Sequence, residues 1–214
     1  VVGRSALRDG HQIPGELSAW VADGGRLLIM GQGTEWTKHS LHVRTAPHQS
    51  RRVFAVDSGH PVVAGLDTDN LKNWNGSSTA ASGYVNYPGN DVVPAYGWRW
   101  GNRHTVSSVP MEKPHMGSWR PILESEFDLA YTPLMEMEYG KGRVTFSTLD
   151  LEGRTDADPA ADTLFNQLAD YVAHAEIPAK ADLVVYNGDQ QGSDLLDFMG
   201  VQYETRTRIP EGAD

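Results

Sequence analysis

The sequence predicts an α/β fold, in which a central and mainly parallel sheet is flanked by helices. Three short apolar runs, each bounded by Gly or polar residues, are typical of strands buried on both faces. They are residues 26–30 (RLLIM), 143–148 (RVTFST) and 183–186 (LVVY). Helix-like stretches alternate with these runs, and that alternation favours a parallel sheet covered on both sides.

The first predicted helix precedes the first apolar run. In PGELSAWVADGG the residues Leu17, Trp20 and Val21 recur at helical spacing, so one face of the helix is apolar. The pair Gly24 and Gly25 follows directly and is a signal for the end of a helix.

The second predicted helix follows the second apolar run. Asp158 and Pro159 form a favourable N-cap and first-turn pair at its start. Apolar side chains then recur along DPAADTLFNQLADYVAHA, at Leu164, Leu168, Tyr171 and Val172.

Residues 181–214 have a β–α–β pattern of their own. A strand LVVYNG, a turn DQQGS, a short helix SDLLDFMG and a strand VQYETRT follow one another. Two interpretations stay open: this segment completes the sheet of the 1–180 domain, or it opens a tandem domain. We favour the first, because an isolated β–α–β unit has no core of its own.

The middle of the chain, residues 35–125, has little regular periodicity and is rich in Gly, Pro, Asn, Ser and aromatic residues. We predict that it is a large, loop-rich insertion.

Charge and composition exclude several classes of partner. A net charge of -10 leaves no basic surface for nucleic acid. No apolar run approaches the roughly 20 residues of a membrane helix, and the sequence shows no basic-then-apolar leader pattern, so we expect no membrane partner. The sequence begins at Val1 without a Met, so we expect a piece of a larger protein. With zero cysteines, thiol chemistry and thiolate metal sites are excluded and the compartment stays open.

Three segments carry a resemblance to a known family: VVGRSALRDG with LSAWVADGGRLLIMGQG, SGHPVVAGLD with DNLKNWNG, and FDLAYTPLMEMEYGKGRVTFSTLDLEGRTDADPAADTLFNQLADYV. Together they resemble the class I glutamine amidotransferase-like domains, of flavodoxin-like type, that are accessory modules of large bacterial glycoside hydrolases. The likeness spans most of residues 1–175. It implies a parent enzyme that degrades polysaccharides and is exported.

The resemblance also implies that the amidotransferase chemistry is lost. Catalytic members hold a cysteine in the turn after the first strand, where this chain reads Gly31-Gln32-Gly33, and an amide cannot act as that nucleophile. After the second strand, LDLEGR supplies Asp150 and Glu152 but lacks the family's His. We therefore expect a vestigial elbow, no cofactor, and a non-catalytic module whose partners are neighbouring domains or another subunit.

Aromatic residues are the main candidates for ligand binding. Glu35 and Trp36 follow the elbow directly, and the other candidates are Trp74, Trp98, Arg99, Trp100 and Trp119, most of them among Asn, Gly, Ser and Arg. Flat rings beside polar groups suit contact with a glycan. The favoured interpretation is packing in a satellite core or against a neighbouring domain, and a carbohydrate-binding module is the alternative.

Two polar clusters were weighed as further sites. His39, His42 and His48 have a spacing that metal ligands could use, but without Cys or an HExxH pattern we predict no metal. The acidic run of Asp150, Glu152, Asp156 and Asp158 does not match an EF-hand, and we expect a polar loop in which Asp158 caps a helix. A hydrolase with a rearranged site at Glu35, Asp150 or Glu152 remains a third alternative.

Overall fold

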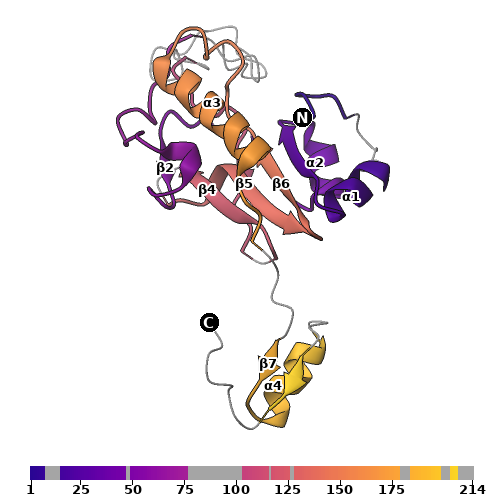
Figure 1. Ribbon diagram of the computed structural model, residues 1–214. Coiled ribbons are helices and arrows are strands. Elements are labelled where there is room, and N and C mark those ends of the chain that lie inside the picture. The colour runs from indigo at the N-terminus through magenta and orange to yellow at the C-terminus, as the bar shows by residue number, and fades with distance from the viewer. Residues whose placement is uncertain are drawn as a thin grey trace, which may run out of the picture. The chain divides into compact units, whose positions relative to one another are not determined.

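The computed structural model describes residues 1–7, 15–46, 49–76, 103–115, 117–125, 128–178, 184–198 and 203–206 (Figure 1). The chain divides into two compact units, Val1–Ile177 and Pro178–Asp214, and each is treated by itself.

The first unit contains a mixed sheet in the order β1-β6-β5-β4-β2, with β3 also paired to β5. The strands are β1 (Arg26–Met30), β2 (Val53–Ala55), β3 (Met111–Glu112), β4 (Arg120–Ser125), β5 (Tyr131–Tyr139) and β6 (Gly142–Ser147). Among these described strands only β1 and β6 pair in parallel, and the other pairs are antiparallel. The predicted mainly parallel sheet is therefore wrong.

The prediction of a mainly parallel sheet failed because residues 131–139, which form β5, were not predicted to be a strand. β5 and β6 form a hairpin joined by Gly140 and Lys141, so a long antiparallel pair lies where a parallel crossover was expected. Gly140 has a φ of 61°, and a Cβ there would lie 2.4 Å from the carbonyl oxygen of Ala22. Glycine is thus required at this turn by both conformation and space.

The helices of the first unit cover both faces of the sheet (Figure 1). They are α1 (Gly15–Ala22), α2 (Thr34–Ser40), the 3-10 turn η1 (Pro61–Val63) and α3 (Pro159–His174). Leu28 of β1 belongs to the core beneath α3 and η1, whereas Leu27 and Ile29 belong to the core beneath α1 and α2. Strand β1 is buried on both faces, as its apolar run predicted.

Helix α3 begins as its sequence predicts. The carboxylate of Asp158 accepts hydrogen bonds from the backbone N–H groups of Ala160 and Ala161, at 2.9 and 3.3 Å. At the other end, the Arg26 guanidinium donates to the Ala175 carbonyl at 3.2 Å and thereby holds the end of α3 beside the start of β1.

The predicted 35–125 insertion is more regular than expected in its described parts. Helix α2 and the short elements β2, η1, β3 and β4 lie within it, because brief strands such as RPILES pair with β5 rather than forming a sheet of their own. Residues 77–102 lie outside the described residues.

The second unit has the predicted β–α–β order. It consists of β7 (Val185–Tyr186), α4 (Gln190–Phe198) and β8 (Glu204–Thr205), and the two strands pair in parallel. The hydroxyl of Tyr186 donates to the carbonyl of Asp189 at 2.8 Å, which fastens the turn between strand and helix. That this segment completes the first sheet stays a prediction.

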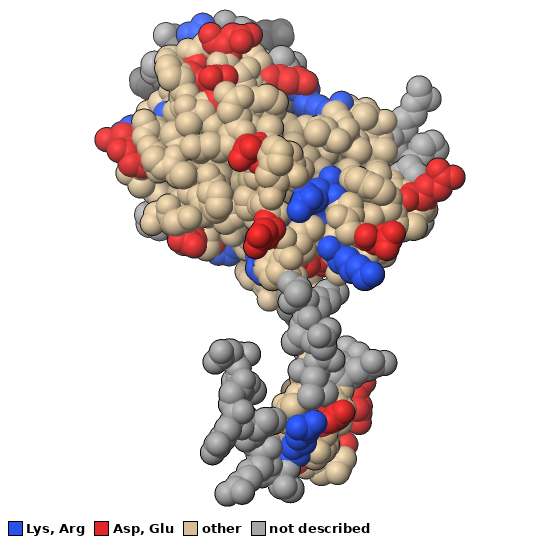
Figure 2. Space-filling view, in the orientation of Figure 1, with Lys and Arg blue, Asp and Glu red and all other residues tan. Residues whose placement is uncertain are grey.

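Charged side chains do not gather into one field of a single sign on the face shown in Figure 2, where Lys and Arg stand in separate groups among Asp and Glu. Of the helices that the structure describes, none combines the length and the apolar character needed to cross a membrane. The absence of nucleic-acid and membrane partners stays a prediction.

Candidate functional site

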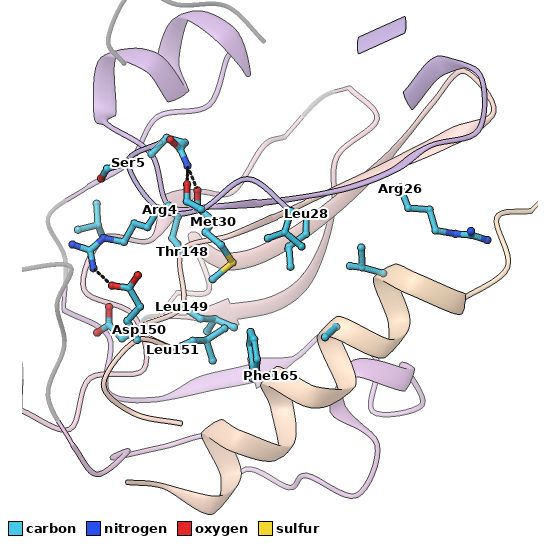
Figure 3. Close-up of a pocket in the computed structure, with 18 of the residues that line it drawn as sticks. Arg4, Ser5, Arg26, Leu28, Met30, Thr148, Leu149, Asp150, Leu151 and Phe165 are labelled. Carbon is cyan, nitrogen blue, oxygen red and sulfur yellow. Dashed lines mark hydrogen bonds and ion pairs between the residues drawn. The ribbon is translucent and has the colours of Figure 1, made fainter. Parts of the chain in front are cut away.

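A groove with a volume of about 1060 Å³ runs along β1 in the first unit. The segment of Val1 to Ser5 forms one wall and α3 forms the other, and the floor is the face of β1 that carries Leu28 and Met30 (Figure 3). The groove ends at the carboxyl edge of β1 and β6, where the turn Gly31-Gln32-Gly33 lies. The predicted elbow is therefore part of its rim.

Helix α3 presents two apolar stripes, and one of them lines the groove. Its core stripe consists of Ala161, Leu164, Leu168 and Tyr171, all buried. The second stripe comprises Phe165, Ala169, Val172 and Ala173, which recur at helical spacing and all line the groove. Phe165 is 38 % exposed in this position. The groove is thus an apolar surface.

Polar groups concentrate at the carboxyl end of the groove. The guanidinium of Arg4 makes an ion pair with Glu152 at 3.1 Å, between the N-terminal segment and the loop after β6 (Figure 3). Asp150 and Thr148 line the same end. This end joins the first residues of the chain to the β6–α3 loop.

The side chain of Gln32 makes three hydrogen bonds to backbone groups. Its amide nitrogen donates to the carbonyl oxygens of Gly3 and Met30, at 2.8 and 2.5 Å, and its oxygen accepts from the N–H of Leu7 at 2.9 Å. Only 9 % of the residue is exposed. Gln32 therefore ties the N-terminal segment to the end of β1, and it directs no group toward a ligand.

The backbone of this turn also lacks the strain of a nucleophile elbow. Gln32 does not have a positive φ, and Gly33 is extended, with φ -59° and ψ 146°. A Cβ at Gly31 would meet only ordinary contacts, at 3.9 Å from the Arg4 side chain and 4.0 Å from the Ser147 carbonyl. Glycine is thus not demanded by the geometry at position 31, contrary to the expected tight turn that needs glycines.

Asp150, which follows β6 in the chain and lines the groove, is buried in a hydrogen-bond network of its own. Its carboxylate accepts from the hydroxyls of Thr105 and Ser108, both at 2.6 Å, and from the backbone N–H of Ser108 at 3.2 Å. Arg154 donates to the same Thr105 hydroxyl at 2.8 Å. Arg154, Thr105 and Ser108 were not predicted from sequence, because they lie far from one another or from Asp150 in the chain and meet only when it folds.

Arg154 clamps a distant loop to the segment before α3. Its guanidinium is fully buried and donates to the carbonyls of Trp74, Asn75 and Gly76 at 2.8 to 3.1 Å. Gly76 has a φ of 84°, and a Cβ there would lie 2.2 Å from the Gly153 carbonyl, so the two loops approach too closely for a side chain. These contacts give Arg154 a structural role, because they join the loop at residues 74–76 to the segment before α3.

The aromatic residues predicted to bind a ligand differ in their burial. Trp36 and Trp74 are fully buried, and the Trp74 indole donates to the Asn70 carbonyl at 2.9 Å. A ligand cannot stack on either ring, so their candidacy for ligand binding is corrected. Trp119 is half-buried against the core that contains Trp36, and Trp98, Arg99 and Trp100 lie outside the described residues.

The remaining predicted polar candidates do not converge. Glu35 is exposed and pairs with His39 on α2 at 3.4 Å. Within the described part of the chain there is no group of three or more His, Cys, Asp or Glu that could hold a metal ion. His48 lies outside the described residues. Of the predicted polar residues, Asp150 and Glu152 thus line the groove together with the elbow, whereas Glu35, His39 and His42 do not.

A second buried polar cluster, which sequence reasoning missed, joins α3 to the sheet. The Tyr171 hydroxyl donates to the Glu136 carboxylate at 2.7 Å, and Arg143 lies 3.5 Å from that carboxylate and 4.9 Å from the Tyr171 ring centre. Burial and the bond to Glu136 raise the pKa of Tyr171 well above its ordinary value. The alternation of Glu136 and Glu138 with Met in β5 was the available signal.

His60 packs against this cluster. Its ring centre lies 4.8 Å from that of Tyr171, and its Nδ1 accepts from the backbone N–H of Val62 at 3.2 Å. Burial lowers the pKa of His60, although Glu136 and Asp57 oppose the shift. Its groups are used in packing and capping.

Comparison with known proteins gives little further identification. No family model matches the chain, and no curated protein matches it. Among solved structures, a ThuA-like protein from Parabacteroides merdae ATCC 43184 is similar, with a TM-score of 0.41 and 14 % identity. The match covers 81 % of this chain and 71 % of that one. At these values the likeness assigns neither an activity nor a family.

Proposed function

We propose that this chain is a non-catalytic structural or interaction module of a polysaccharide-degrading glycoside hydrolase. The parentage rests on the resemblance of residues 1–175 to the amidotransferase-like accessory domains of such enzymes. The lack of catalysis rests on one observation, the three hydrogen bonds that commit the Gln32 side chain to backbone groups.

The geometry around Gln32 supports a loss of chemistry rather than a rearrangement. A nucleophile at this turn needs a base within hydrogen-bond reach, and the described residues that line the groove include no His. Asp150, a buried acid that lines the groove, already accepts hydrogen bonds from Thr105 and Ser108. Glu152 is held in an ion pair with Arg4. The polar groups of this corner serve to hold loops together.

An interaction role fits the groove. Its apolar floor and its α3 wall provide a surface for another polypeptide segment, and Arg4 and Glu152 at its carboxyl end are paired with each other. The partners that we propose are neighbouring domains of the parent enzyme or another subunit, and the parent is exported.

A second candidate function is glycan binding. Trp20, which is 51 % exposed, and Phe165 both line the groove, and exposed rings suit contact with the faces of sugars. Titration of Trp fluorescence with polysaccharide fragments tests it. A saturable change below millimolar glycan would support this candidate, and an unchanged spectrum with every glycan would remove it.

The rearranged hydrolase is tested with three separate variants, Glu35→Gln, Asp150→Asn and Glu152→Gln. If the chain hydrolyses a glycoside, loss of turnover in one correctly folded variant would support this alternative. Equal turnover in all three would remove it.

The proposed function is tested directly by sequencing the parent gene on both sides of the segment that encodes residues 1–214. A glycoside hydrolase catalytic domain in the same reading frame is the expected result. A different catalytic class, or an isolated reading frame limited to this segment, would contradict it.

A further inference from the structure

His60 caps the start of the 3-10 turn η1 with its own side chain. The ring Nδ1 accepts a hydrogen bond from the backbone N–H of Val62 at 3.2 Å, and His60 is the N-cap residue of the turn. This bond requires a lone pair on Nδ1, whereas both ring nitrogens of an imidazolium are donors. The cap therefore exists only while Nδ1 carries no proton.

The His60 ring lies between η1 and the C-terminal half of α3. Its centre is 4.8 Å from that of the Tyr171 ring, and the two ring planes are tilted by 55°. The residue is only partly buried, so solvent still reaches it. A histidine in such a position can exchange a proton with water in the range of pH in which an ordinary imidazole titrates.

Charged groups face His60 from the elements packed around it. These groups are Asp57 of its own loop, Arg120 of β4, Glu136 of β5 and Arg143 of β6. Tyr171 of α3 adds a hydroxyl, which donates to Glu136 at 2.7 Å. The carboxylates of Asp57 and Glu136 attract an imidazolium, while the Val62 N–H repels it. A charged His60 ring is therefore drawn away from the position in which it caps the turn.

The rest of η1 is anchored by contacts that do not titrate. Val62 and Val63 are buried in the core beneath α3. The side-chain amide of Gln167 on α3 donates to the Ala64 carbonyl at 2.8 Å. Loss of the cap should therefore open the start of the turn without removing the turn from the core.

We propose that His60 is a pH-sensitive latch at the start of η1. A proton taken up from water by Nδ1 removes the acceptor for the Val62 N–H. The imidazolium then turns toward Glu136 and Asp57, and the first residues of the turn open. Release of the proton at higher pH restores the cap.

The exchange of the Val62 amide, followed by NMR on the full chain and divided by the intrinsic rate at each pH, tests the latch. Its protection should fall about fivefold as the pH is lowered from about 7.5 to 5, as expected for the loss of a side-chain cap. The midpoint should match that of the His60 ring resonances and lie below about 6.5, because burial lowers the pKa of His60. An equal loss of protection in the amides of β6 would overturn the proposal, since the whole unit would then be loosening.

Variants at position 60 separate the cap from the charge. His60→Asn keeps a favourable N-cap side chain that does not titrate, so the Val62 amide should stay protected at both ends of the pH range. His60→Ala should give weak protection at both ends. His115→Gln removes an exposed histidine and should leave the response of the unaltered chain unchanged. A pH response that persists in His60→Asn, or equal protection of Val62 across the range in the unaltered chain, would overturn the proposal.

Discussion

The polar turn at Gln32 and the apolar groove beside it lie at the same end of the sheet. They differ in how completely their side chains are engaged by contacts within the first unit. The Gln32 amide makes three hydrogen bonds to the backbone. The groove, by contrast, leaves Phe165, Ala169 and Ala173 of the second α3 stripe exposed within the first unit. A turn whose Gln32 side chain is already hydrogen-bonded to the backbone, beside an exposed apolar wall, is suited to packing rather than to chemistry.

Arg154, which is fully buried, should show the largest effect of removing a polar side chain. Arg154→Met should lower the free energy of unfolding by about 3–5 kcal/mol, because three backbone carbonyls and the Thr105–Asp150 pair lose a buried cationic donor. Urea denaturation measures the change. Asp156→Asn, at an exposed position of the same loop, should stay within about 0.5 kcal/mol. A similar small loss in both variants would show that the clamp is unimportant.

The two stripes of α3 allow a direct contrast on one helix. Leu168→Ala in the core stripe should cost about 2–5 kcal/mol, because it opens a cavity in a closed core. Phe165→Ala in the groove stripe should cost less, since its ring is 38 % exposed. The midpoint of thermal unfolding ranks the two variants. A larger loss at Phe165 would mean that its ring is much more covered than the first unit alone shows.

Gln32→Ala tests whether the turn is structural. The change removes one acceptor and one donor that together serve Gly3, Met30 and Leu7, so we expect a loss of about 1–3 kcal/mol in unfolding free energy. Gln32→Glu keeps the acceptor for Leu7 but loses the donor, and should also destabilise the protein. Full stability of both variants would remove the assigned role of Gln32 as a structural link.

The smallest expected effect is a pH dependence from His60. Burial lowers its pKa in the folded state, so the unfolded chain binds the proton more readily and stability falls as pH drops below about 6.5. His60→Gln should reduce this acid-side slope between pH 7 and 5, measured by denaturation at each pH. His115→Gln, at an exposed position, serves as the control. An unchanged slope in His60→Gln would contradict the assignment.

The sequence predicted the features that local patterns determine. The apolar run of β1, the Asp158 cap and the core stripe of α3 all appear where their residues indicate. The antiparallel strand β5 was not predicted because YTPLMEMEY has a Pro near its start. Its sequence is neither a continuous apolar run nor a regular alternation of apolar and polar residues. Trp74 looked like a binding residue because burial of an aromatic in a Gly- and Asn-rich segment depends on distant partners, here Arg154.

The site was predicted only in outline for a similar reason. The absence of a nucleophile at Gln32 can be read directly, but its hydrogen bonds join residues 25 and 29 positions away in the sequence. The groove is likewise made by segments from opposite ends of the first unit. Such contacts depend on the parallel pairing of Val2 with β1, which no local pattern specifies.

The central claim is that the groove is a packing surface for a neighbouring domain or another subunit. The unfolding free energy of Ala169→Glu compared with that of Asn166→Glu, measured in the parent protein with the proposed partner present, tests it most directly. If the groove is covered, a carboxylate at position 169 is buried without a partner and should cost about 1–3 kcal/mol, whereas Asn166→Glu should change stability by less than about 0.5 kcal/mol. Equally small changes in both variants would contradict the account.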